Sequence, residues 1–297
     1  MNFGSVENPG QINFSLPENH PETDKLLSKV NNSKSPGIYV GCAKWSRKDL
    51  KNFYPRGTKD ELEYYSNQFN AIELNATFYR NFSAKQVQEW YDKTPEDFRF
   101  FPKVHQRVSH LKWLKDFEQP SEDFLSSVMH LKEKLGTVFL QMRDNFGPKY
   151  MDRLQNFVEW WPKDVPLAIE LRHPEWFSDA TVFEEMVQLL EENKVANVLV
   201  DTAGRRDMLH MRLTNNEVFV RYVGANHETD YSRLDGWVDR LEDWTDQGLQ
   251  NIYFFVHQNE EVESPVLAAH FIQQLNERLG TDLKIPQTTK TLQKGLF

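Results

Sequence analysis

Short β-rich runs alternate with longer amphipathic helical segments along most of the chain. The runs begin at Ile38, Ala71, Arg99, Thr137, Pro166, Ala196, Val218 and Asn251. Strands that alternate with helices in this way indicate a parallel sheet with crossover helices. Eight such units predict one closed (β/α)8 barrel of the TIM type, an α/β fold, over residues 37–297. An open doubly wound sheet is the alternative, and no Gly-rich phosphate turn supports it.

Two parts of the chain depart from this pattern. The segment between the sixth and seventh runs, residues 202–217, offers at most a short helix. Residues 1–36 are rich in Asn, Ser, Pro and Glu, with scattered apolar residues. We predict that they form an N-terminal extension laid over the barrel domain, and we assign no chemistry to them.

Charge and cysteine content limit the class of partner. The formal net charge of -9 disfavours binding to nucleic acid unless basic residues gather on one face. No run approaches the roughly 18 apolar residues of a membrane helix, and the first residues lack the order of a signal peptide. The single cysteine, Cys42, is expected to be a buried thiol. We therefore expect a cytoplasmic protein with no membrane partner; its oligomeric state stays open.

Side-chain alternation along the strands predicts which residues line the barrel. In the second strand Ile72 and Leu74 face the helices, which turns Glu73 and Asn75 inward. The same alternation gives further inward or strand-exit polar positions, and these are Lys103, His105, Gln141, Arg143, Glu170, Arg172, His173, Asp201, Arg221 and His257, with Trp45 ending the first strand. Earlier inward positions are apolar plugs, namely Phe101, Phe139, Ala168, Leu199 and Phe219. The polar residues thus gather at the carboxyl ends of the strands, where barrels of this type hold their sites.

The inward charges lean positive in an acidic protein. Converging guanidinium groups favour an anionic ligand such as a phosphate ester, a carboxylate or a nucleic-acid backbone. Our first hypothesis is an enzyme in which Lys103, Arg172 and Arg221 hold a small anion while Glu73 or Glu170 moves a proton, with His105 a further catalytic candidate. The remaining polar residues, Trp45, Asn75, Gln141, Arg143, His173, Asp201 and His257, are expected to bind substrate. A purely structural charge network is the alternative.

Other chemistries have weaker support. Glu73 and Glu170 could act as a glycosidase pair, but cationic neighbours would keep both ionised. Oxygen and nitrogen donors for a metal are present, yet there is no H-E-x-x-H spacing, so no metal is expected. No G-x-S-x-G, G-x-G-x-x-G or P-loop sequence occurs, and no cofactor is expected. A metal-dependent phosphodiesterase or nucleic-acid binder and a non-catalytic metabolite-binding protein stay open as alternatives.

Several stretches together carry a family resemblance. They are G-C-A-K-W at 41–45, F-Y-P at 53–55, F-N-A-I-E-L-N-A-T-F-Y at 69–79, D-F-R-F-F-P-K at 97–103 with Ser109-His110 after it, and E-L-R-H-P-E-W-F at 170–177. With these the chain resembles the YecE-like family (domain of unknown function 72) from Ile38 to Phe297. It departs from many members at Cys42-Ala43-Lys44 and at Val223-Gly224. The resemblance implies a (β/α)8 barrel with Glu73, Asn75, Lys103, Glu170, Arg172 and His173 at the pocket, and it implies no reaction.

Overall fold

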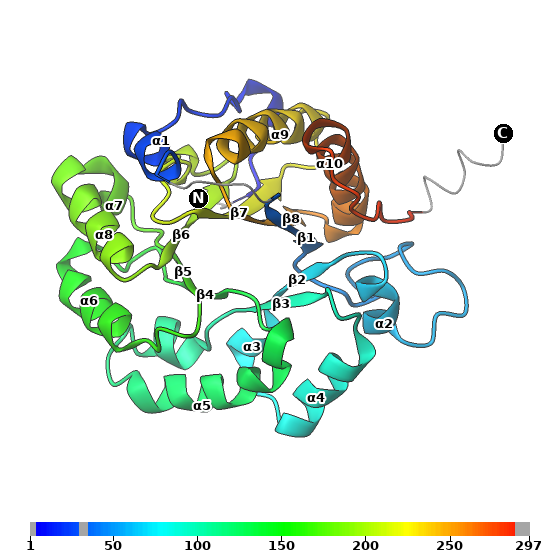
Figure 1. Cartoon of the computed structure of the whole chain (residues 1–297), viewed down its shortest axis with the longest axis horizontal. Coiled ribbons are helices and arrows are strands. Elements are labelled where there is room, and N and C mark those ends of the chain that lie inside the picture. The colour runs from blue at the N-terminus through cyan, green and yellow to red at the C-terminus, as the bar shows by residue number, and fades with distance from the viewer. Residues whose placement is uncertain (1–3, 30–34, 289–297) are drawn as a thin grey trace.

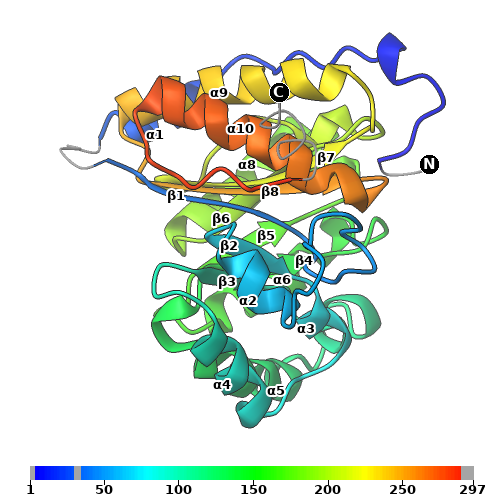
Figure 2. The ribbon, with the colours of Figure 1, turned by 90° about the vertical axis from the view of Figure 1, so that its right-hand side faces the viewer.

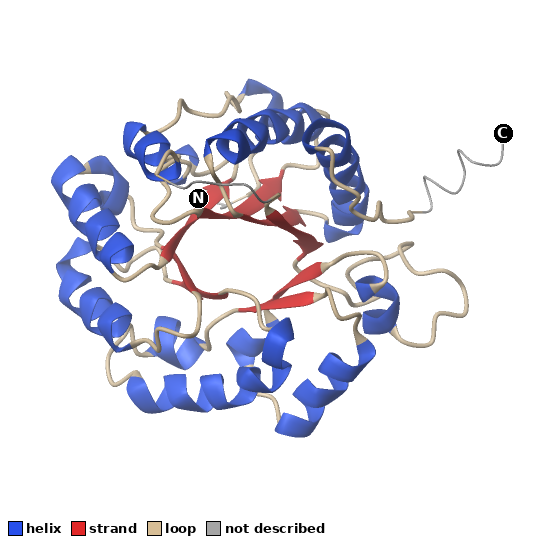
Figure 3. Ribbon diagram, viewed as in Figure 1, coloured by secondary structure: helices blue, strands red, loops and turns tan. Residues whose placement is uncertain are grey.

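Eight parallel strands form one barrel in the computed structural model, which describes residues 4–29 and 35–288 (Figures 1 and 3). The strands are β1 (Gly37–Cys42), β2 (Ala71–Leu74), β3 (Arg99–Pro102), β4 (Val138–Gln141), β5 (Leu167–Glu170), β6 (Ala196–Asp201), β7 (Glu217–Gly224) and β8 (Asn251–Gln258). Their order in the sheet is β3-β2-β1-β8-β7-β6-β5-β4. The predicted TIM-type barrel is confirmed.

The barrel closes between β3 and β4 at a seam of two bridges, Phe100 with Leu135 and Lys103 with Phe139. The amide of Gly136 donates to the carbonyl of Phe100 at 2.8 Å, and the amide of Val104 donates to that of Phe139 at 2.9 Å. The other neighbouring strands pair in continuous register, so strand pairing is least regular at this seam.

Helices surround the strands as an outer ring (Figure 1). They are α2 (Glu61–Ser66), α3 (Ala76–Tyr79), α4 (Ala84–Lys93), α5 (Glu118–Val128), α6 (Met151–Trp160), α7 (Glu175–Ser178), α8 (Ala180–Glu192), α9 (Thr229–Gln247) and α10 (Ser264–Leu279). Helix α8 shows why these segments fold as they do. The side chain of Asp179 caps its first turn, and Phe183, Met186, Val187 and Leu190 form a buried stripe at helical spacing.

The N-terminal extension fills a gap in that ring. Between β6 and β7 the chain forms only the 3₁₀ turn η5 (Arg206–Met208), as the sequence predicts. Helix α1 of the extension (Pro21–Leu27) lies there, between α8 and α9 (Figure 1). The hydroxyl of Thr23 donates to the carbonyl of Met211 and accepts from the amide of Leu213, both at 2.9 Å. A distant segment thus satisfies the backbone where a crossover helix is missing.

The described part of the extension before α1, residues 4–20, runs beside α9 (Figure 2). The ring of Phe14 is buried 4.1 Å from the guanidinium of Arg233 and 5.5 Å from that of Arg206. Arg240 donates to the carbonyl of Pro17 at 2.7 Å. These contacts tie the extension to the barrel along the whole helix.

One of two cores fills the inside of the barrel, and alternate strand residues form it. The predicted plugs Phe101, Phe139, Ala168 and Phe219 all belong to it. The prediction for Leu199 is wrong, because Val198 and Val200 point inward and Leu199 packs in the outer core under the helices. Asp201, two residues after Leu199, also faces outward.

Cys42 is buried in the outer core, as predicted, and burial raises the pKa of its thiol well above the usual range. Within the described residues, no helix combines the length and apolarity needed to cross a membrane.

Candidate functional site

Arg221 on β7 joins two buried carboxylates from opposite parts of the barrel. Its Nε and Nη2 donate to Oε2 and Oε1 of Glu73, both at 2.9 Å, and its Nη1 donates to Oε2 of Glu170 at 2.7 Å. Glu73 is the last but one residue of β2, and Glu170 is the last residue of β5. The predicted inward side chains therefore meet at the carboxyl ends of the strands.

Other donors fill the remaining positions on both carboxylates. Glu73 accepts from Asn75 Nδ2 at 2.8 Å and lies 2.9 Å from Nε2 of His257. Glu170 accepts from Nε2 of Gln141, at 3.0 Å to each oxygen. Arg172 Nε donates to its Oε1 at 2.5 Å. Every carboxylate oxygen of the pair is occupied.

These partners fix the charge state of the two glutamates. Burial raises the pKa of Glu73, but Arg221 and His257 more than offset it and hold it well below the usual range. Burial likewise raises the pKa of Glu170, and Arg172 with Arg221 brings it down to about 2. An ionised carboxylate only accepts hydrogen bonds, so Nε2 of His257 carries the hydrogen that it shares with Glu73. The geometry gives both glutamates an electrostatic role and leaves them poorly suited to moving a proton at neutral pH.

Lys103 contributes the amine of the site. It follows β3 and is 8% exposed. Its Nζ donates to Oε1 of Gln141 at 2.7 Å and lies 4.3 Å from the centre of the Phe78 ring. Across the described residues it forms no ion pair with a carboxylate. Burial, followed by the neighbouring guanidinium of Arg221, lowers the pKa of Lys103 to about 7.

His110 also contacts Phe78. It belongs to η2 (Arg107–Leu111), a single turn of π-helix, and its ring meets that of Phe78 edge-on at 4.7 Å. Burial, with Lys103 and Arg143, lowers the pKa of His110 to about 4, so its imidazole is neutral at pH 7. Strand alternation could not find this loop residue. The Ser109-His110 pair within the family resemblance was the available signal.

The loop that carries His110 is strained. Trp113, Leu114 and Asp116 have φ angles of 54°, 55° and 45°, in the left-handed region that favours glycine. Such residues persist only where the surrounding structure imposes them, and they concentrate at functional sites. Together with the π-helical turn, this strain singles out the loop after β3.

Two groups are exposed to solvent at the carboxyl-terminal opening of the barrel, which we call the mouth. Arg143 follows β4 and is exposed, and its guanidinium forms no hydrogen bond or ion pair within the described part of the chain. It is close enough to His110 to affect the pKa of that imidazole. Tyr79 is 68% exposed and packs edge-on against Phe78 at 5.0 Å. The mouth thus presents a cation and an aromatic ring beside the buried amine.

Asp201 is not part of this network. Its carboxylate is fully buried against α9, where it accepts from Arg233 Nη2 and Trp237 Nε1, each at 2.8 Å, and it also pairs with Arg206. The prediction that Asp201 faces the lumen is wrong. The strong donors on α9 and η5 draw the last side chain of β6 to the outside.

Besides Asp201 and Arg143, the structure leaves three other predicted residues outside the network. Nδ1 of His105 accepts from the amide of Arg107 at 3.2 Å. Nδ1 of His173 accepts from the amide of Glu175 at 3.3 Å, and its ring lies against Gly147. These two, and Trp45, which packs edge-on against Trp90 at 5.8 Å, have no hydrogen bond to either buried glutamate.

No three His, Cys, Asp or Glu side chains of residues 4–29 and 35–288 gather as ligands of a metal ion. The titratable cluster of the barrel is instead one of guanidinium, carboxylate and amine groups.

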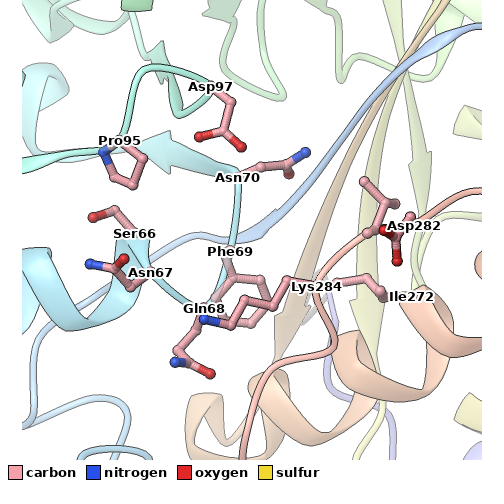
Figure 4. A pocket seen from close by; sticks show the side chains of 11 residues that line it. Ser66, Asn67, Gln68, Phe69, Asn70, Pro95, Asp97, Ile272, Asp282 and Lys284 are labelled. Carbon is pink, nitrogen blue, oxygen red and sulfur yellow. The ribbon is translucent and has the colours of Figure 1, made fainter.

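A hollow of about 340 Å³ lies at the other end of the barrel (Figure 4). Its walls include Asn67, Phe69 and Asn70 before β2, Asp97 before β3 and Lys284 after α10. Because the strands are parallel, these segments lie at the amino-terminal face. That face of a TIM-type barrel serves stability, and chemistry resides at the opposite face.

The segments that build the site lie within the part of the chain that matches known proteins. The sequence profile described as "Protein of unknown function DUF72" matches residues 39–291. The chain belongs to the DUF72 family. The UPF0759 protein YecE of Escherichia coli strain K12 is 26% identical over 275 residues, which cover 84% of this chain and 98% of the relative. The UPF0759 protein YunF of Bacillus subtilis strain 168 is 26% identical over 245 residues, which cover 76% of this chain and 80% of the relative.

Solved structures of DUF72 proteins share the fold. A protein from Enterococcus faecalis superposes with a TM-score of 0.66 at 22% identity and covers 85% of this chain and 98% of its own. A protein from Thermotoga maritima gives a TM-score of 0.61 at 24% identity and covers 81% of this chain and 99% of its own. The N-terminal extension, residues 1–36, precedes the match to the DUF72 profile.

Proposed function

We propose that this DUF72 protein is an enzyme that acts on a small molecule bearing a phosphate or carboxylate group at the carboxyl-terminal face of the barrel. One observation carries the proposal. Lys103, Arg143, Arg172 and Arg221 gather there around only two buried carboxylates, Glu73 and Glu170. An anionic ligand would balance this surplus in a protein whose net charge is -9.

Turnover is favoured over passive binding by the titration state of the site. The Lys103 amine changes charge near pH 7, and a group of that kind can donate or accept a proton under physiological conditions. A neutral imidazole, His110, lies beside it. In this proposal Glu73 and Glu170 orient the arginines. Lys103, and not a glutamate, is the group that exchanges protons.

The proposed ligand is a small molecule and not nucleic acid, because the acidic net charge repels a polyanion. We also propose a cytoplasmic location. One cysteine, buried as a free thiol, agrees with a reducing compartment.

Titration calorimetry with inorganic phosphate and with pyruvate tests the binding part. We expect Arg143→Ala and Arg172→Ala each to weaken binding at least about tenfold, the loss typical of a charge-assisted hydrogen bond. Arg278→Ala is the matched control, since Arg278 pairs with Asp239 and Glu242 on the outside of the barrel. Equal affinities in all three variants, or no anion binding by the folded wild type, would overturn the proposal.

Mass spectrometry of phosphorylated and carboxylated metabolites incubated with the protein tests catalysis. Product that forms with the wild type and not with Lys103→Met supports an enzyme. Ligand that is bound and recovered unchanged from every mixture supports a non-catalytic metabolite-binding protein instead.

A further inference from the structure

We infer that Lys103 is an amine nucleophile that forms a Schiff base with its substrate. The substrate class is then an aldehyde or ketone that also bears a carboxylate or phosphate group. This inference rests on the proposed function and adds the reacting group and the bond that forms.

The first support is the way the amine is held. Nε2 of Gln141 donates to both oxygens of Glu170, which turns its Oε1 toward Lys103. The amine therefore has a neutral acceptor on one side and the Phe78 ring on another. The nearby carboxylates are taken by guanidinium groups. A buried lysine with no carboxylate partner among the described residues is costly as a structural element, since its charge is left uncompensated.

The second support is the charge around it. The groups that act on Lys103 are Glu73 from β2, Glu170 at the end of β5, Arg172 after it and Arg221 from β7. His110 of η2 is close enough to Lys103 for the two to interact electrostatically, and its imidazole is neutral. Burial and the guanidinium groups outweigh the carboxylates, so a large share of the amine is unprotonated at neutral pH. An unprotonated amine has the lone pair that attack on a carbonyl carbon requires.

Lys134 shows what a structural lysine looks like in the same protein. It is also buried, but its Nζ donates to the carbonyls of Tyr91 and Thr94, each at 2.6 Å, and to the hydroxyl of Thr94 at 3.3 Å. Three acceptors require three N–H groups, so this amine stays an ammonium ion. Lys134 is an internal control for reactivity.

The reaction balances without an oxidant or reductant. The Lys103 nitrogen forms a bond to the carbonyl carbon, and the carbonyl π electrons move to oxygen. A proton passes from nitrogen to that oxygen and gives a carbinolamine. The C–O bond then breaks, water leaves with one proton taken from solvent, and the protonated C=N bond forms. Arg143 and Arg172 would hold the anionic group of the substrate during these steps.

Borohydride trapping tests the inference. The protein is incubated with pyruvate or dihydroxyacetone phosphate, reduced with sodium borohydride, digested and mapped by mass spectrometry. We expect a secondary-amine adduct on Lys103 at least about tenfold above that on Lys134, because Lys134 lacks a free lone pair. Lys103→Arg, which keeps the cation, should lose this adduct. Circular dichroism melting of Lys103→Arg and Lys103→Met shows whether each variant is folded.

The outcomes separate this inference from the proposed function. Anions that bind in an Arg143-dependent way without an adduct on Lys103 overturn the inference and leave the proposed function standing. Acetone that labels Lys103 as fast as pyruvate overturns the anionic substrate class. Labelling of Lys103 at the rate of Lys134 overturns the nucleophile.

Discussion

Arg221 and Glu73 meet side-on in the barrel, with Nε and Nη2 of the guanidinium each 2.9 Å from a different carboxylate oxygen. The third donor group of the fork reaches Glu170. One cation thus bridges two carboxylates that would otherwise repel each other. We expect Arg221→Met to lower the free energy of unfolding by about 3–5 kcal/mol, as for other buried ion pairs that lose one partner.

Urea unfolding measures this loss. The triple variant Glu73→Gln, Glu170→Gln, Arg221→Met removes the charges together and should recover most of the stability. If the single variant is as stable as the wild type, the two carboxylates do not depend on Arg221.

Acid should destabilise the protein through the same pair. The folded-state pKa values of Glu73 and Glu170 lie below those of the unfolded chain, so the unfolded chain binds more protons as the pH falls. Their contribution to stability is complete above the ordinary glutamate pKa of about 4.3 and is lost as the pH falls toward about 2. Urea unfolding from pH 6 to pH 3 should show a steeper loss in the wild type than in Glu170→Gln. Parallel curves would contradict this.

Lys103 should change stability in the same direction as the glutamates but in a higher range of pH. Its folded-state pKa of about 7 lies below the unfolded value, so the cost of its burial is complete below pH 7 and shrinks as the pH rises. We expect Lys103→Met to be more stable than the wild type at pH 6, with a difference that narrows by pH 9. The check is the free energy of unfolding of both proteins at the two pH values. A constant difference would mean that Lys103 titrates alike in both states.

Asp201 should matter for stability and not for ligand binding. Asp201→Ala leaves the buried guanidinium of Arg233 with Asp230 as its remaining acidic partner. We expect a loss of about 3–5 kcal/mol in unfolding free energy. Calorimetry with phosphate should give an unchanged affinity for the variant, and a large drop would place Asp201 in the site after all.

The N-terminal extension should act as part of the barrel domain. Phe14→Ala removes a buried ring from between two guanidinium groups and should cost about 3–5 kcal/mol. Lys25→Ala is the control, because Lys25 is exposed on α1 and such changes stay within about 0.5 kcal/mol. Thermal melting that does not distinguish the two variants would mean that the extension is only loosely docked.

Alternation along the strands predicted both the barrel and most of the site. Glu73, Gln141, Glu170 and Arg221 are flanked by apolar residues that must pack under helices, which leaves one orientation for each. Their meeting followed from the closure of parallel strands. The periodicity is strong wherever both neighbours of a polar residue are apolar.

The wrong and missing predictions concern residues whose direction is not determined by alternation along a strand. Residues 198–200 of β6 are all apolar, so alternation does not decide which of them face inward. Donors from α9, far along the chain, hold Asp201 on the outside. His105 lies beyond the end of β3, where the chain has begun to turn. His110 comes from a loop, and the docking of α1 depends on contacts such as Thr23 with Met211, across nearly the whole domain. Local sequence carries no signal for contacts of that range.

The bridge between Lys103 and Phe139 makes the seam between β3 and β4 part of the candidate site. β3 and β4 are the two ends of the strand order, and Lys103 and its partner Gln141 stand on opposite sides of the joint between them. In a sheet that is open at this seam, Lys103 and Gln141 are both present, but the hydrogen bond between them is not formed. The joint that closes the barrel therefore also brings the Lys103 amine to Gln141, and the amine that we propose as the nucleophile is held in place only when the barrel is closed.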